Sequence, residues 1–300
     1  MSAHFLTILD MTCEEAWGVL GRAQEMKKTN YRGDLLAGKI LALIFEKAST
    51  RTRVSFDVAV RQLGGQTIFM TPADSQLGRS EPIRDTARVL SRYVDGLIVR
   101  TFEQKKLEEL VEYGSIPVIN ALSDDYHPCQ VMSDILTMRE RCADLTGVKL
   151  AYVGDGNNMV HSWINAAVHF PIELSIASPL GYQPRADIME NAIKRGARIS
   201  LTTKPEVAAA GARFLYTDVW ASMGQEAEQK EREKAFAGYQ VNDALMTVAH
   251  PDCQVMHCLP AHRGEEITDK VMEGPASIVF DQAENRLHMQ KAIIERIFSK

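Results

Sequence analysis

The feature that most constrains the fold is a repeated alternation of short apolar runs with amphipathic segments. Buried strands are expected at residues 40–45, 66–70, 95–99, 116–119, 149–153, 173–177, 198–201, 213–217, 254–257 and 277–280. After a first helix at 12–30, further helices are expected at 52–63, 82–92 and 103–113, and near 157–169, 185–195 and 225–237. Strands that alternate with helices in this way predict an α/β fold, with parallel sheets covered by helices.

The alternation starts twice, which indicates two domains. A chain of 300 residues is long enough for two medium domains that each have a core. A helical stretch at about 131–143 joins them, so we expect a first domain at 1–137 and a second at 138–285. The final segment, 283–298, is long enough to pack back onto the first domain, and residues 286–300 are therefore assigned to it.

Composition excludes several classes of protein. The net charge is −5 and no basic block is present, so nothing points to nucleic acid. Every apolar run is shorter than the ~20 residues of a membrane span, so no membrane partner is expected. The five cysteines are irregularly spaced, and the N-terminus lacks the pattern of a secretory signal. Both observations favour free thiols in a reducing compartment, and we expect a cytoplasmic protein.

The strongest candidate for a ligand site is the junction between the run 40–45 and the helix that follows it. Ser49, Thr50, Arg51 and Thr52 lie there, where a helix start offers free backbone N–H groups and the positive end of its dipole. These groups together predict a phosphate receptor. The alternative is a Ser/Thr helix cap followed by solvated arginines.

Two further groups follow strands of the first half. Arg100 comes directly after 95–99, and His127 precedes Pro128, which fixes the entry to a helix. The helix dipole disfavours a protonated His127, and a neutral imidazole can donate a hydrogen bond to a carbonyl oxygen. The alternatives are a surface arginine and a capping or core histidine.

The second half repeats the arrangement. The turn 154–158 has Met159 where a G-x-G-x-x-G motif needs its third glycine, so it is a weak nucleotide signal but suits a polar ligand. Asp218 is followed by Ser222 and Gly224, and a carboxylate and a hydroxyl beside a glycine would suit an amino-acid zwitterion. The alternative is a loop in which Asp218 is exposed.

Cys258 follows the run 254–257 and stands beside His257. Zinc would need two further ligands at fitting spacing, which the sequence does not offer. Packing, or a partly activated thiol beside a substrate amine, are the other interpretations.

Three motifs resemble the signatures of the transcarbamylases. They are Ser-Thr-Arg-Thr-Arg at 49–53, His-Pro-Cys-Gln at 127–130 and His-Cys-Leu-Pro at 257–260. Asp218 with Ser222-Met223-Gly224, together with segments 74–79 and 154–158, is similar to the ornithine branch of that family and not to the aspartate branch. Matching segments run from 38 to 286, which is most of the chain.

The resemblance implies transfer of the carbamoyl group of carbamoyl phosphate to the side-chain amine of L-ornithine, by direct attack in a closed two-domain cleft. The products would be L-citrulline and phosphate, with no metal and no cofactor, and arginine biosynthesis is the expected role. The resemblance also implies a homotrimer, or a multiple of trimers, in which the loop that holds Gln76 reaches a neighbouring subunit's site. The alternatives are a transcarbamylase for another amine, such as putrescine or a modified ornithine, and, more remotely, a nucleotide-binding Rossmann protein.

The resemblance also assigns roles to residues. Carbamoyl phosphate would be bound by Ser49, Thr50, Arg51, Thr52, Gln76, Arg100, His127, Gln130 and Arg286. Ornithine would be bound by Asn158, Asp218, Ser222, Met223, Cys258 and Leu259. The catalytic groups would be Thr52, Arg100, His127, Asp218 and Cys258. Either Cys258 or Asp218 would take the proton that the amine must lose.

Overall fold

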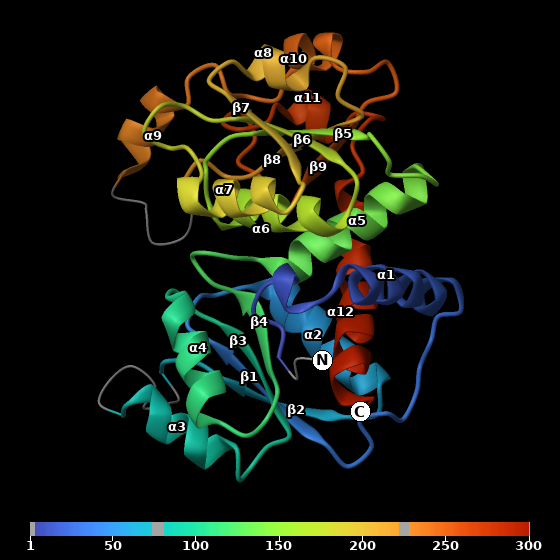
Figure 1. The fold of residues 1–300 in the computed structure, drawn as a ribbon, viewed down its shortest axis with the longest axis vertical. Helices are drawn as coiled ribbons and strands as arrows, with labels where there is room; N and C mark the ends of the chain where they lie inside the picture. The colour runs from blue at the N-terminus through green and yellow to red at the C-terminus, as the bar shows by residue number, and fades with distance from the viewer. Residues whose placement is uncertain (1–3, 74–80, 222–227, 300) are drawn as a thin grey trace. The chain divides into compact units, whose positions relative to one another are not determined.

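The computed structural model describes residues 4–73, 81–221 and 228–299 of the chain. The chain divides into two compact units, Met1–Leu136 with Glu284–Lys300, and Thr137–Ala283. The divisions fall inside two helices, α5 (Pro128–Arg141) and α12 (Val279–Phe298). Each unit contains one parallel sheet with helices on both faces, which confirms the expected fold class (Figure 1).

The sheet of the first unit has the strand order β2-β1-β3-β4. Its strands are β1 (Ile40–Phe45), β2 (Gln66–Met70), β3 (Gly96–Arg100) and β4 (Val118–Leu122). In Figure 1, α3 (Ile83–Leu90) and α4 (Gln104–Tyr113) lie on one face, and α1 (Cys13–Lys28) and α2 (Thr50–Gln62) lie on the other. A 3-10 turn, Ile8–Asp10, precedes α1. A capping box between Thr12 and Glu15 begins α1, because each side chain accepts the other residue's backbone N–H.

The C-terminal helix packs onto the first unit, as expected from the sequence. Arg22 Nε donates to Glu295 Oε1 at 2.6 Å. The ammonium of Lys291, which is fully buried, donates to the Tyr31 carbonyl at 2.8 Å and to Gln62 Oε1 at 3.0 Å. At the far end of α12, the Phe298 ring lies so close to Gly96 that a Cβ there would be 2.8 Å from it. These contacts fix α12, and with it Arg286, against the sheet of the first unit.

The sheet of the second unit has the order β7-β6-β5-β8-β9. Its strands are β5 (Lys149–Val153), β6 (Glu173–Ala177), β7 (Arg198–Thr202), β8 (Phe214–Thr217) and β9 (Gln254–His257). Two helices, α6 (Asn158–His169) and α7 (Ala186–Lys194), cover one face, and α8 (Pro205–Ala209), α10 (Asp243–Val248) and α11 (Asp269–Met272) cover the other (Figure 1). A further helix, α9 (Gln229–Ala235), lies between β8 and α10 in the chain. The strands β5, β8 and β9 are neighbours, so their carboxyl ends meet at one edge.

One predicted strand is wrong. The run 277–280 makes a single bridge, between Ser277 and Val255, and α12 then begins at Val279. So short an apolar run fits a strand or a helix equally well, and the acidic Asp281 in the first turn favours the helix. Among the residues that the structure describes, no helix is long and apolar enough to span a membrane.

Candidate active site

The first half of the candidate site lies at the carboxyl ends of β1, β3 and β4. These strands are neighbours in the sheet, and Phe45 at the end of β1 is in register with Arg100 at the end of β3. The strand order reverses at β1, with β2 on one side and β3 on the other. Open α/β sheets bind ligands at such a reversal, in the crevice outside the carboxyl ends.

The junction between β1 and α2 has the geometry of an anion receptor. Ser49 is the N-cap of α2, with extended backbone, and its Oγ accepts the Thr52 N–H at 3.2 Å. The side chain of Thr52 is buried, whereas Thr50 is exposed. Arg51 Nε is buried and has no hydrogen-bond partner among the residues that the structure describes. A guanidinium donor in that position can bind an anionic ligand.

Arg286 reaches the same junction from α12. Its Nη2 donates a hydrogen bond to Thr52 Oγ1, and its side chain is buried. Lys27 Nζ donates to Asn285 Oδ1 at 2.7 Å, beside Arg286 on the same helix. The structure therefore brings Thr52 and Arg286 together, although they are 234 residues apart in the chain.

His127 is held as a neutral imidazole. Burial lowers its pKa well below the ordinary value, and the positive charges of Arg286 and Arg100 lower that pKa further. The His127 carbonyl accepts the N–H groups of Gln130 and Val131 in the first turn of α5. A neutral imidazole beside two guanidiniums can donate to a developing oxyanion without adding a third positive charge.

The other residues of the His-Pro-Cys-Gln motif are also buried. Gln130 Nε2 donates to Asp134 Oδ1 at 2.8 Å. Gln130 Oε1 is a buried acceptor without a partner in the described parts of the chain, and it can receive an N–H from a ligand. Burial raises the pKa of Cys129 to about 12, so Cys129 is a packing residue and not a nucleophile.

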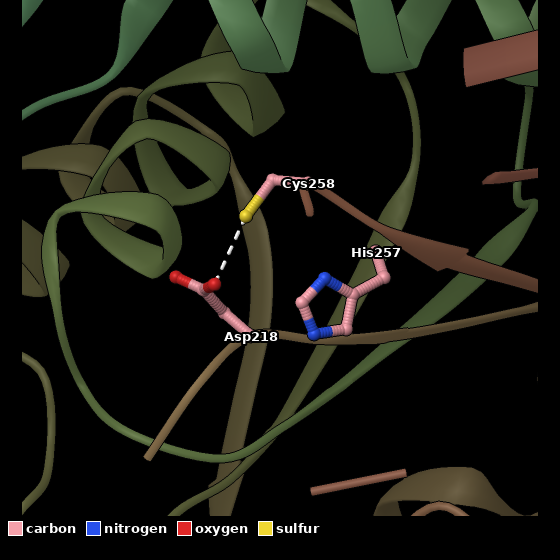
Figure 2. A group of neighbouring side chains, drawn as sticks. All are labelled: Asp218, His257 and Cys258. Carbon is pink, nitrogen blue, oxygen red and sulfur yellow. Dashed lines mark hydrogen bonds between the residues drawn. The ribbon is translucent and has the colours of Figure 1, made fainter. Parts of the chain in front are cut away.

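The second half lies at the carboxyl ends of β5, β8 and β9. Asp218 follows β8, is buried, and is surrounded by donors: the Val219 N–H and the Cys258 thiol both lie 2.9 Å from Oδ1. Asn157 Nδ2 donates to Asp218 Oδ2 at 3.1 Å. Figure 2 shows the Cys258 sulfur pointing at the Asp218 carboxylate. The chain thus presents a carboxylate and a thiol as one hydrogen-bonded pair.

Asn157 and Tyr152 extend this pair. The Tyr152 hydroxyl donates to Asn157 Oδ1 at 3.2 Å, and the same oxygen caps α6 through the Met159 N–H. Burial raises the pKa of Tyr152 well above its ordinary value, and the charges of Asp218 and Asp155 raise it further. Tyr152 therefore stays a neutral donor. Within the turn 154–158, the resemblance assigns an ornithine contact to Asn158, the first residue of α6, whereas the hydrogen bond to Asp218 comes from its neighbour Asn157.

A buried Glu266 orients the loop that carries Cys258. His257 Nε2 lies 3.1 Å from Glu266 Oε1, and His257 Nδ1 accepts the Leu259 N–H at 2.9 Å. These contacts assign the proton to Nε2. Leu259 has a left-handed backbone (φ 60°), which is costly for a branched residue, so the hydrogen bond to His257 helps to hold it. Leu259 and Cys258 are thereby fixed in position.

The ligand atoms of Asp218, His257 and Cys258 lie within 4.8 Å of one another, close enough to share a metal ion. Figure 2 shows the three side chains together. Both His257 nitrogens are already engaged, however, with Leu259 and with Glu266. A metal would have to displace one of these hydrogen bonds, so the arrangement fits an orienting histidine better than a metal ligand.

Asp155 and Arg232 form a buried ion pair next to this half. Arg232 Nη1 lies 2.9 Å from Asp155 Oδ2. Burial raises the pKa of Asp155 to about 6, and Asp218 raises it too, whereas the Arg232 charge lowers it. Sequence patterns gave no sign of this pair, or of Glu266, because the partners are not related by helical or strand spacing. Gln76, Ser222 and Met223 lie outside the described residues.

Both halves have relatives among known proteins. Residues 3–140 match the family described as aspartate/ornithine carbamoyltransferase, carbamoyl-P binding domain. Residues 146–297 match its Asp/Orn binding domain. The ornithine carbamoyltransferase of Nitratidesulfovibrio vulgaris is 64% identical over 300 residues, 100% of both chains.

Solved structures agree with these matches. The ornithine carbamoyltransferase from Pyrococcus furiosus is 48% identical, with a TM-score of 0.92, over 97% of this chain and 96% of that one. The anabolic ornithine carbamoyltransferase from Campylobacter jejuni is 40% identical, with a TM-score of 0.93, over 98% of both chains. The similarity therefore extends over nearly the whole chain, in sequence and in fold.

Proposed function

The chain belongs to the aspartate/ornithine carbamoyltransferase family, and from this premise we propose that it transfers the carbamoyl group of carbamoyl phosphate to the side-chain amine of L-ornithine. The products are L-citrulline and phosphate. One observation carries the choice of ornithine over aspartate as acceptor: the buried Asp218 carboxylate, 2.9 Å from the Cys258 thiol. A buried carboxylate attracts the ammonium groups of ornithine and would repel the second carboxylate of aspartate.

In this proposal, residues 1–137 and 286–300 form the carbamoyl phosphate-binding domain. The N–H groups at the start of α2, with Ser49, Thr50 and Arg51, bind the phosphate and stabilise it as it leaves. Arg286, which contacts Thr52, adds a second guanidinium to the same anion. Gln76 is assigned to this ligand by the family resemblance alone.

The carbamoyl oxygen is the atom on which negative charge builds when the amine attacks. Thr52, Arg100 and His127 are its donors, and Gln130 Oε1 accepts from the carbamoyl NH₂ group. Donors that are strongest towards the developing charge lower the barrier, because they bind the transition state better than the substrate. The low pKa of His127 keeps it neutral at pH 7, so it acts as a hydrogen-bond donor and not as a general acid.

Residues 138–285 form the ornithine-binding domain in this proposal. Asn158, Asp218, Ser222 and Met223 bind the α-amino acid end, and Cys258 with the Leu259 carbonyl faces the side-chain amine. An alkylammonium is protonated at pH 7 and must lose a proton before it attacks. The Cys258 sulfur accepts that proton while its own proton passes to Asp218 Oδ1, the oxygen to which the thiol already donates.

The wider context is also proposed. Arginine biosynthesis is the role, supported by the similarity to the anabolic enzyme from Campylobacter jejuni. A cytoplasmic homotrimer, or a multiple of trimers, is the assembly, with sites at the subunit interfaces. Light scattering after size-exclusion chromatography tests the assembly: a mass of three chains, or a multiple of three, supports it and a monomer contradicts it.

A citrulline-forming assay with carbamoyl phosphate tests the activity. Ornithine, putrescine and aspartate are offered at equal concentration, and the product is identified by mass. We expect turnover with ornithine and none with aspartate. Turnover with putrescine and not with ornithine would overturn the proposal, because an acceptor without an α-amino acid end does not need Asp218 and Asn158 together.

A further inference from the structure

The Asp155–Arg232 pair is almost completely buried, yet it belongs to neither substrate-binding set. The two side chains are 9% and 8% exposed, and their charged atoms are 2.9 Å apart. Arg232 Nη1 also donates to the Trp220 carbonyl at 2.9 Å. One nitrogen therefore holds a carboxylate from the turn after β5 and a carbonyl from the segment after β8.

The two hydrogen-bond partners of Arg232, Asp155 and Trp220, lie close in the chain to the residues that form the Asp218–Asn157 contact. Asp155 is two residues before Asn157, whose amide donates to Asp218 Oδ2. Trp220 is two residues after Asp218 itself. Arg232 consequently joins the two segments that bring Asp218 and Asn157 into contact.

The surroundings of the pair are closely packed. A Cβ at Gly156 would lie 2.3 Å from the Gln183 backbone, so the turn after β5 is pressed against that segment, and the Gly156 N–H donates to the Tyr182 carbonyl at 2.7 Å. The Arg232 guanidinium lies 5.0 Å from the centroid of the Tyr182 ring. A small shift of Arg232 would therefore be transmitted to the turn after β5, because closely packed side chains cannot move independently.

Stability alone does not account for a buried ion pair here. Two apolar side chains of similar volume are often as stabilising as such a pair, because desolvation offsets the attraction between the charges. Arg232 has an electrostatic function that an apolar residue cannot supply. Its charge lowers the pKa of Asp155, whereas the nearby Asp218 raises that pKa. Arg232 thus offsets part of the rise in the pKa of Asp155 that burial causes.

We propose that Asp155 and Arg232 are positioning residues for the α-amino acid end of the acceptor, and that they set the affinity for ornithine through the geometry of Asn157 and Asp218. The inference rests on the proposed function. It places the two residues outside the binding of carbamoyl phosphate, and they act on the chemical step only through Asp218, which receives the proton from Cys258 in the proposed mechanism. Their loss therefore raises KM for ornithine and leaves KM for carbamoyl phosphate nearly unchanged.

The test uses Arg232→Met, Arg232→Lys and the double variant Asp155→Asn/Arg232→Met, each as the full chain. Arg198→Met is the matched control, since Arg198 forms an exposed pair with Glu173 in the same unit. We expect Arg232→Met to raise KM for ornithine about tenfold or more, the size of one lost charged hydrogen bond, and to lower kcat, while KM for carbamoyl phosphate changes less than about threefold. The single ammonium of Arg232→Lys can replace Nη1 and should restore most of the affinity.

The double variant keeps the inference testable if Arg232→Met does not fold, because it leaves no buried charge without a partner. It should fold and still have a raised KM for ornithine, since the hydrogen bond from residue 232 to the Trp220 carbonyl is lost. An unchanged KM for ornithine in variants that fold overturns the inference. An equal rise in KM for ornithine and in KM for carbamoyl phosphate, which Arg232→Lys does not reverse, also overturns it. If the wild-type chain forms no citrulline from ornithine, the proposed function itself fails, which is a distinct result.

Discussion

Substitution of Asp218 by asparagine gives the sharpest test of how the two substrates are divided between the two units. The change keeps the size of the side chain and removes its charge. In the structure, Oδ1 accepts from the Val219 N–H and the Cys258 thiol, and Oδ2 accepts from Asn157 Nδ2. All of these partners are donors. An asparagine has one acceptor and one donor group, so one of its contacts must set a donor against a donor.

The magnitude follows from these contacts. A hydrogen bond to a charged group contributes about 1.5–3 kcal/mol, and the ammonium of ornithine would lose such a bond, which corresponds to about a 10- to 100-fold rise in the dissociation constant. The contact between two donors in Asp218→Asn is present with and without ligand. It therefore lowers the free energy of unfolding more than it lowers the affinity for ornithine. In the proposed division of the site, carbamoyl phosphate contacts none of the affected atoms, so its affinity should change by less than about twofold.

Calorimetric titrations of carbamoyl phosphate and of ornithine into Asp218→Asn measure both effects, and citrulline formation measures turnover. Turnover should fall further than the loss of ornithine affinity explains, because in the proposed mechanism Asp218 also receives the proton from Cys258. Asp187→Asn is the control, since Asp187 is an exposed carboxylate paired with Arg185 in the same unit. Equal losses of affinity for the two substrates would refute the assignment of Asp218 to ornithine.

Three further outcomes are expected. Arg51→Ala should weaken carbamoyl phosphate about 10- to 100-fold by calorimetry, because it removes a charged donor, and unchanged binding would remove Arg51 from the phosphate site. The pKa of His127 is lowered on folding, so stability is full above about pH 6.5 and falls by up to about 1.4 kcal/mol per pH unit below it. His127→Gln should lack that component in thermal melts, and identical acid profiles would contradict it. Cys258→Ser should lower kcat about 10- to 100-fold at pH 7, because a hydroxyl relays a proton poorly, and an unchanged kcat would exclude the thiol from proton transfer.

Most strands, and the polar residues that follow them, could be predicted from the sequence because both depend on local patterns. The apolar runs 40–45 and 149–153 each predict a strand, and the strands β1 and β5 begin and end at those same residues. Short segments were less readable. The run 277–280 predicts a strand, but α12 begins within it at Val279, and α8, α10 and α11 are too short to show helical periodicity.

The supporting contacts of the candidate site could not be predicted. Glu266 is nine residues from His257, and Arg232 is 77 residues from Asp155. Nothing in the spacing of these residues distinguishes them from the exposed charges around them, since Arg232 occurs in the run Glu-Arg-Glu-Lys. Only the fold shows that they are buried. The roles of residues in the motifs rest on local chemistry, whereas the orientation of those residues rests on distant partners.

The contact between Phe298 and Gly96 has a consequence for the order in which this protein can be made. The first unit includes Glu284–Lys300, so one of the helices that pack onto it is missing until these residues have been synthesised. The second unit, Thr137–Ala283, is complete before then. Domains usually fold in the order in which they leave the ribosome. Here the domain that is begun first is finished last, and a chain released early would contain a complete second unit and a first unit that still exposes part of its core.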